Sequence, residues 1–293
     1  MQASHRKPAR NLFRPKGNEM KAKKAILILL ALSFCAIAPT AEAKRRDKGQ
    51  TAKKPATEVV DVFWSMRSPY CYIALDRILA IREAYDVQVN LRPIWPIAIK
   101  DPNFFKGIQY MKYRVPYQDL DTLRSAEFQN MPYVYPTPDP VKQKPNFGPV
   151  LPLDQQDDIK LLTYTAIEAT QQGKGWDYLD QVSRMMWNGT VKDWTKGNEL
   201  RDAINRAGLD GDKLIAMAKD KKNEKRYQNL INANQKLQDA ANHGGVPLFA
   251  VRGEPFFGQD RIDQLMWRLK QYGVKLKPGA TPVNPNGPNT CNP

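Results

Sequence analysis

Cysteine and histidine are scarce in this sequence, with three cysteines and two histidines among 293 residues. One of each lies within the first 43 residues, which leaves Cys71, Cys291 and His243 in the rest of the chain. A single histidine excludes a histidine-rich zinc site and argues against a Ser-His-Asp triad. We therefore expect no metal site, and we expect His243 to cap a turn or face solvent rather than act in catalysis.

The sequence also lacks an apolar run long enough to anchor it in a membrane. Lysines at positions 21, 23 and 24 precede an apolar run from Ala25 to Ala38, which Ala41-Glu42-Ala43 follows. This order is typical of a secretory signal peptide cleaved after Ala43, and the run is too short to span a bilayer stably. Residues 1–43 are therefore predicted to be a signal peptide, with Met20 favoured as the true start. We expect a periplasmic or secreted protein with no stable membrane span.

A basic stripe of the kind that binds nucleic acid is absent as well. Signal cleavage removes eight of the 45 basic and two of the 30 acidic residues, which leaves 37 against 28, a net charge of +9. These charges are scattered, and the densest run, residues 219–226, falls in a helical pattern that predicts a solvated face. We expect no nucleic-acid partner.

The first structured part of the chain has a strand-helix-strand pattern. Residues 44–56 contain few apolar side chains and are predicted to be a disordered linker. Residues 58–64 are predicted to form a buried strand, and residues 87–94 a second strand that ends at prolines. Between them, Ser68 provides an N-cap, and Pro69 occupies the first helical position, where its missing N–H costs nothing.

The middle of the chain, residues 96–242, has helical periodicity with proline-rich interruptions. Two short strands follow, at residues 248–252 and 254–257, and then an amphipathic helix at 261–272. Residues 57–95 and 243–276 thus form one α/β unit that encloses the helical segment, and residues 277–293 are predicted to be a flexible tail. The helices expected within the segment are 117–128, 155–172, 176–187, 197–207, 211–221 and 224–242.

Two distant motifs and one internal motif carry a resemblance to a known family. The distant motifs are Ser68-Pro69-Tyr70-Cys71 and Gly244-Gly245-Val246-Pro247, and the internal one is Asp121-Thr122-Leu123-Arg124-Ser125-Ala126. Together they resemble the branch of the DsbA superfamily that holds 2-hydroxychromene-2-carboxylate isomerases and kappa-class glutathione transferases. The resemblance covers nearly all of residues 58–272. It implies a thioredoxin-like α/β fold of order β-α-β … β-β-α with a large all-helical insertion.

The chemistry is expected at Ser68 and Cys71, the predicted catalytic residues. A helix start favours a thiolate, so a lowered pKa is predicted for Cys71 beside Arg67 if its sulfur faces the free N–H groups. The resemblance implies that Ser68 replaces the attacking cysteine of the dithiol oxidoreductases. In the isomerases and transferases this serine binds the thiolate of glutathione. The structural alternatives are an N-cap role for Ser68 and a buried spacer role for Cys71.

The resemblance also implies a binding set around these two residues. Val246 would offer its backbone to a bound peptide or glutathione, beside a cis bond to Pro247. Asp260 and the residue before it would bind the γ-glutamyl end of glutathione, although Asp260 could equally cap the last helix. The predicted binding residues are Pro69, Tyr70, Val246, Pro247, Gln259 and Asp260.

Three functions are open at this point. The first is an exported thiol-dependent oxidoreductase of the DsbA type that uses Cys71, with Cys291 as a partner in an oxidising compartment. The second is a glutathione-dependent isomerase or transferase in which Ser68 orients the thiol. The third is a non-catalytic protein that binds a thiol-containing peptide or small molecule. The sequence favours the first in its broad form, because an export signal suits it better than the second.

Overall fold

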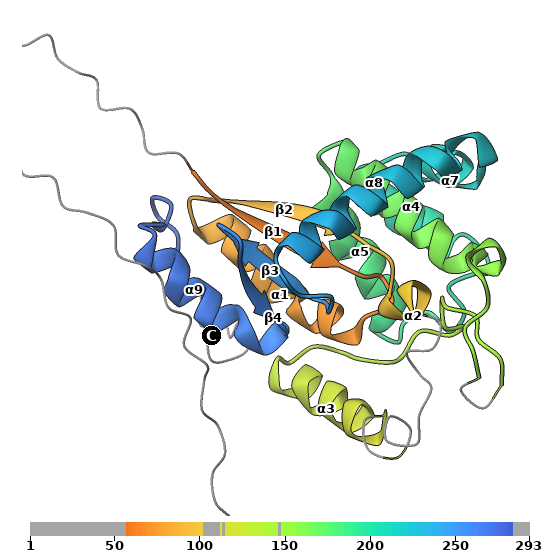
Figure 1. Cartoon of the computed structure of the whole chain (residues 1–293), viewed down its shortest axis with the longest axis horizontal. Coiled ribbons are helices and arrows are strands. Elements are labelled where there is room, and N and C mark those ends of the chain that lie inside the picture. The colour runs from red at the N-terminus through yellow and green to blue at the C-terminus, as the bar shows by residue number, and fades with distance from the viewer. Residues whose placement is uncertain (1–56, 102–111, 113–114, 146–147, 284–293) are drawn as a thin grey trace, which may run out of the picture. The chain divides into compact units, whose positions relative to one another are not determined.

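A computed structural model describes residues 57–101, 112, 115–145 and 148–283 of the chain (Figure 1). The predicted signal peptide, the predicted linker at 44–56 and Cys291 lie outside these residues, so the structure does not test them. The described residues belong to one compact unit, Lys54–Pro293.

A four-stranded mixed sheet is the centre of this unit (Figure 1). Its strands lie in the order β2-β1-β3-β4; β1 is parallel to β2 and antiparallel to β3, and β3 is antiparallel to β4. The strand bounds are Glu58–Trp64 for β1, Val87–Pro93 for β2, Leu248–Val251 for β3 and Glu254–Phe257 for β4. All four predicted strands are confirmed, to within a residue at their ends.

Helix α1, Pro69–Ala84, makes the crossover between the parallel strands β1 and β2. Its apolar residues, among them Ile73, Leu75 and Ile78, are buried in the main core with Val60 and Val62 of β1. The helix is apolar around most of its circumference, which is typical of a helix covered by protein on several sides. Helix α5 of the insertion, Gly175–Trp187, covers one of these sides.

Some helices of the insertion pack on the β2 edge of the sheet or on α1, and others pack on one another. Helices α4 and α8 contact β2, and α5 contacts both α1 and α4. Figure 1 shows these helices gathered to one side of the sheet, with α3 apart from them below α1. The described helices here are α2 Ile97–Lys100, α3 Val115–Phe128, η2 Leu153–Gln155, α4 Asp157–Gln171, α5 Gly175–Trp187, α6 Glu199–Arg206, α7 Gly211–Lys219 and α8 Lys221–Ala240. The six predicted helices are confirmed, whereas the single turn of α2 was not predicted.

The chain leaves α8 through a short loop and returns to the sheet as the hairpin β3–β4. A single-turn 3₁₀ helix, Gln259–Arg261, and α9, Ile262–Gln271, complete the unit. The first residue of the predicted tail is bound to α1, because the Lys277 N–H donates to Ala84 O at 2.8 Å. The predicted α/β fold, a thioredoxin-like unit with a large helical insertion, is confirmed.

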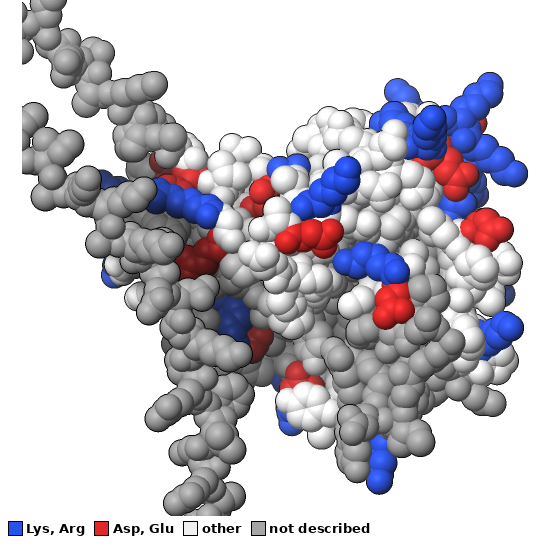
Figure 2. Space-filling model, in the orientation of Figure 1, with Lys and Arg blue, Asp and Glu red and all other residues white. Residues whose placement is uncertain are grey.

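Lys and Arg side chains gather over α7 and the first turns of α8, with acidic groups among them (Figure 2). Residues 219–226 are exposed or half-buried there, which confirms the solvated helical face predicted for this run. None of the described helices is long and apolar enough to cross a membrane.

Candidate functional site

Ser68 lies at the junction between β1 and α1, where it caps the helix. Its backbone is extended (φ −90°, ψ 118°), and its Oγ accepts a hydrogen bond from the Cys71 N–H at 3.3 Å. A hydroxyl carries one donor hydrogen and two acceptor sites, so this bond leaves the Ser68 O–H able to donate to a ligand. The predicted N-cap role and a ligand-binding role are therefore compatible.

Ser68 opens onto a cavity of about 430 Å³. Three other predicted binding residues line the same cavity: Pro69, Tyr70 and Val246. Pro247 lies buried directly after Val246, the peptide bond between them is cis, and its carbonyl accepts the Gly258 N–H at 2.9 Å. The remaining walls include Trp95, Ile97, Gln118, His243 and Phe257.

Cys71 does not have the environment that the sequence predicted. Its side chain is 0% exposed within the core, and burial raises the pKa of its thiol to about 12. Hydrogen bonds with the Ser65 backbone and the Ser68 side chain lower this pKa and offset only part of the effect. The expectation of a thiolate at Cys71 is therefore wrong, because the apolar core disfavours the charged form more than the helix start favours it.

Arg67 is bound by a carboxylate from the insertion. Its Nε and Nη2 donate to the two carboxylate oxygens of Asp139 at 2.8 and 2.6 Å, a bidentate pair. The same carboxylate accepts the Val141 N–H at 2.9 Å and the Tyr135 O–H at 3.3 Å. The guanidinium thus attaches the proline-rich segment, residues 131–153, to the start of α1, and the Asp139 carboxylate compensates its charge.

The internal motif proves to bind Tyr70. The Tyr70 hydroxyl donates to Asp121 of α3 at 2.8 Å, and Arg124 donates to the other oxygen of the same carboxylate at 2.9 and 2.6 Å. Burial, followed by this hydrogen bond, raises the pKa of Tyr70 above its ordinary range. The Asp-x-x-Arg spacing therefore fixes α3 against the rim of the Ser68 cavity.

Gln259 and Asp260 do not line the Ser68 cavity. They line a separate hollow of about 640 Å³, together with Arg77, Arg124 and Asp263. Asp260 is exposed and pairs with its neighbour Arg261 at 2.7 Å. The two cavities share α3, because Gln118 lines the first and Arg124 the second. Three of the six predicted binding residues thus line the Ser68 cavity, and a fourth, Pro247, directly follows Val246, whereas Gln259 and Asp260 line the separate hollow.

The sequence analysis did not predict several of the side chains that line the Ser68 cavity, among them Trp95, Ile97, Gln118, His243 and Phe257. His243 caps a turn, as expected, because its Nδ1 accepts the Gly245 N–H at 3.0 Å, and its half-buried ring also stacks on Phe257 with ring centroids 4.1 Å apart. Its position just before the Gly-Gly-Val-Pro loop was the available signal. Among the described residues, no group of three or more histidines, cysteines or carboxylates could hold a metal ion.

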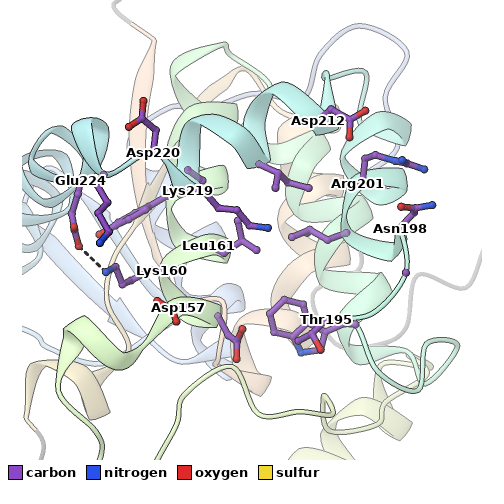
Figure 3. A pocket seen from close by; sticks show the side chains of 18 residues that line it. Asp157, Lys160, Leu161, Thr195, Asn198, Arg201, Asp212, Lys219, Asp220 and Glu224 are labelled. Atoms are coloured by element: carbon purple, nitrogen blue, oxygen red, sulfur yellow. Dashed lines mark ion pairs between the residues drawn. The ribbon is translucent and has the colours of Figure 1, made fainter.

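A third cavity, also of about 640 Å³, lies within the insertion, between α4, α6, α7 and the start of α8 (Figure 3). Many of the side chains that line it are charged, and Lys160 and Glu224 form an ion pair at 2.7 Å. None of the predicted site residues lines this cavity. We therefore place the candidate site at the smaller cavity, where Ser68 and the cis-proline loop meet.

Known proteins of the same fold include an isomerase and a probable oxidoreductase. A 2-hydroxychromene-2-carboxylate isomerase structure is 17% identical, covers 73% of this chain and 96% of its own, and has a TM-score of 0.54. A probable DsbA oxidoreductase from Streptomyces coelicolor is 18% identical, and the match covers 78% of this chain and 93% of the oxidoreductase, with a TM-score of 0.50. At these identities the likeness shows the fold alone. No curated protein matches the sequence.

The family comparison identifies the family to which the chain belongs. The model of the DSBA-like thioredoxin domain matches residues 59–270, which include Ser68, Cys71 and the loop at Val246-Pro247. The match spans well over half of the chain and includes both halves of the sheet as well as the insertion. The chain therefore belongs to the DSBA-like thioredoxin domain family.

Proposed function

We propose that this chain is a thiol-dependent enzyme that binds a small external thiol of the glutathione type at Ser68. The observation that carries the proposal is the contrast between Ser68, which lines the cavity, and Cys71, whose sulfur is buried. The proposed reaction is of the isomerase or transferase type, in which the bound thiolate attacks a second substrate.

The thiol must come from outside the cavity-lining residues. No cysteine lines the Ser68 cavity, and Cys71 is the one free cysteine among the described residues. A disulfide forms when a thiolate attacks a sulfur, which needs both ionisation and access. Cys71 has neither in the folded state, so the geometry favours an external thiol over the redox role that the sequence favoured.

The cavity suits a thiolate and an apolar substrate together. The Ser68 hydroxyl and the positive end of α1 both favour an anion, as at other helix starts. Trp95, Ile97 and Phe257 provide apolar walls. A volume of about 430 Å³ lies within the roughly 300–1,000 Å³ usual for small-molecule sites.

Calorimetric titration of the chain with glutathione tests the proposal. We expect binding that weakens about tenfold or more in Ser68→Ala, because a hydrogen bond to a charged group is lost. Cys71→Ala is the matched control, and its affinity should equal that of the unmodified chain. Absence of glutathione binding would remove the proposal. An effect confined to Cys71→Ala would restore the oxidoreductase function.

A further inference from the structure

The loop between α8 and β3 carries Val246 to the wall of the Ser68 cavity through two consecutive glycines, Gly244 and Gly245. Glycine has no side chain to pack and has more backbone freedom than any other residue, so this pair does not order the loop by itself. Position 245 requires glycine, because a Cβ there would lie 2.4 Å from Phe257 Cε2. The order of the loop must therefore come from contacts that other residues make with its backbone.

Gln238 of α8 makes the central contact with this loop. Its side chain is 0% exposed, and its Nε2 donates to Gly245 O at 2.8 Å. At the other end of the amide, Oε1 accepts a hydrogen bond from Lys100 Nζ at 3.0 Å. A backbone carbonyl can only accept and an ammonium can only donate, so the two partners determine which way the amide faces. Both ends of this buried side chain are thus bonded in one orientation.

Lys100 of α2 bonds the loop directly as well. Its Nζ donates to Gly244 O at 3.3 Å, in addition to the bond to Gln238. The Gly245 N–H donates to His243 Nδ1 at 3.0 Å. Side chains therefore bond three backbone groups of the glycine pair, and two of these side chains come from helices of the insertion.

Helix α8 is itself bonded to the sheet beside this loop. Asn234 lies one turn before Gln238 and is also buried, and its Nδ2 donates to the carbonyl of Pro93, the last residue of β2, at 2.9 Å. Residues four apart share a face of a helix, so one face of α8 bonds both the sheet and the loop. Neither Gln238 nor Lys100 is among the described residues that line the Ser68 cavity.

We propose that Gln238 and Lys100 are positioning residues of the Ser68 site, which hold Val246 in place on the cavity wall without touching the ligand. The inference rests on the proposed function, in which a thiol of the glutathione type binds in this cavity. Without the two side chains, the glycine pair would become ordered only when the ligand binds, and that loss of conformational entropy would weaken binding. The insertion thus contributes to ligand affinity from outside the cavity.

Calorimetric titration of Gln238→Met with glutathione tests this inference. Methionine keeps an unbranched side chain in the buried position and removes both hydrogen bonds, and we expect affinity to fall about tenfold. The matched control is Gln228→Met on the same helix, which removes the bond from Gln228 Nε2 to Tyr164 Oη at 2.9 Å. Both variants should unfold at lower urea concentrations, but Gln228→Met should keep the glutathione affinity of the unmodified chain.

Two results of the titration would overturn the inference and leave the proposed function standing. One is equal glutathione affinity in Gln238→Met and the unmodified chain. The other is the same loss of affinity in Gln228→Met as in Gln238→Met, because the effect would then follow from lower stability alone.

Lys100→Met provides a second variant at a half-buried position, in case Gln238→Met does not fold. We expect glutathione affinity to fall about threefold, because Gly244 O and Gln238 Oε1 lose their donor. Its matched control is Lys277→Met, which removes a bond from Lys277 Nζ to Arg82 O at 2.7 Å. Unchanged affinity in Lys100→Met, or an equal loss in the control, would overturn the inference.

Hydrogen exchange of the Gly245 amide, followed by NMR without ligand, measures the order of the loop directly. We expect faster exchange in Gln238→Met and in Lys100→Met than in the unmodified chain, and no change in Gln228→Met. Unchanged exchange in Gln238→Met would overturn the inference whether or not glutathione binds. Absence of glutathione binding by the unmodified chain would instead remove the proposed function, together with the contribution to affinity that is inferred from it.

Discussion

The Ser68 hydroxyl accepts its hydrogen bond from the Cys71 N–H, so the residue that faces the cavity caps the helix turn that buries the thiol. The two residues are one turn apart and have opposite surroundings. This arrangement supports the proposal that Ser68 binds an external thiolate, because Ser68 lines the cavity and the Cys71 side chain is buried.

Native Cys71 should resist alkylation. The prediction concerns the Cys35→Ser, Cys291→Ser chain, in which Cys71 is the remaining cysteine. Iodoacetamide should label it fully in denaturant and very slowly in buffer up to about pH 9, because burial holds its pKa at about 12 against roughly 8.5 for a free thiol. Rapid labelling of the folded protein near neutral pH would contradict the buried thiol.

The same burial predicts a stability that depends on alkaline pH. The pKa of Cys71 is higher in the folded than in the unfolded chain. The neutral thiol therefore contributes fully to the free energy of unfolding below about pH 8.5, and this contribution is lost as the pH rises toward 12. Between pH 8 and pH 10 the free energy of unfolding, measured with urea, should fall by roughly 1–2 kcal/mol more in the unmodified chain than in Cys71→Ala. Parallel pH profiles for the two proteins would contradict this.

Asp139→Asn should loosen the attachment of the proline-rich segment. The variant removes the charge from a bidentate pair in which the side chains are 16% and 29% exposed. We expect a loss of about 1–2 kcal/mol in the free energy of unfolding and faster proteolysis within residues 131–153. The matched control is Lys196→Ala, whose pair with Asp193 has a lysine that is 82% exposed, and it should change stability by less than about 0.5 kcal/mol.

Export is tested by the N-terminus of the protein recovered from cells. The charged-apolar-small pattern predicts cleavage after Ala43, so periplasmic protein should begin at Lys44. Protein that keeps the apolar segment from Ala25 to Ala38 would contradict the signal-peptide prediction.

The strands and helices were predictable because local signals agree with the tertiary structure. The apolar run of β1 and the Ser68-Pro69 helix start each specify their element without help from distant residues. The orientation of Cys71 was not predictable. Helix α1 is buried on most sides, so its periodicity does not distinguish a core-facing position from a cavity-facing one.

Parts of the site depend on contacts between distant residues, which one sequence does not reveal. Asp139 meets Arg67 across 72 residues, and Asp121 meets Tyr70 across 51. The wall residue Gln118 depends on where α3 packs. The family resemblance predicted Ser68 and the Val246-Pro247 loop as site residues. The further side chains that line the cavity depend on how the insertion packs, which the resemblance did not predict.

The most direct test of the account is the pKa of the glutathione thiol when it is bound to the chain, followed by the ultraviolet absorbance of the thiolate. We predict a pKa clearly below that of free glutathione for the unmodified chain, and a return to the free value in Ser68→Ala, with Cys71→Ala unchanged. A bound thiol whose pKa is the same in the unmodified chain and in Ser68→Ala would contradict the claim that Ser68 stabilises an external thiolate.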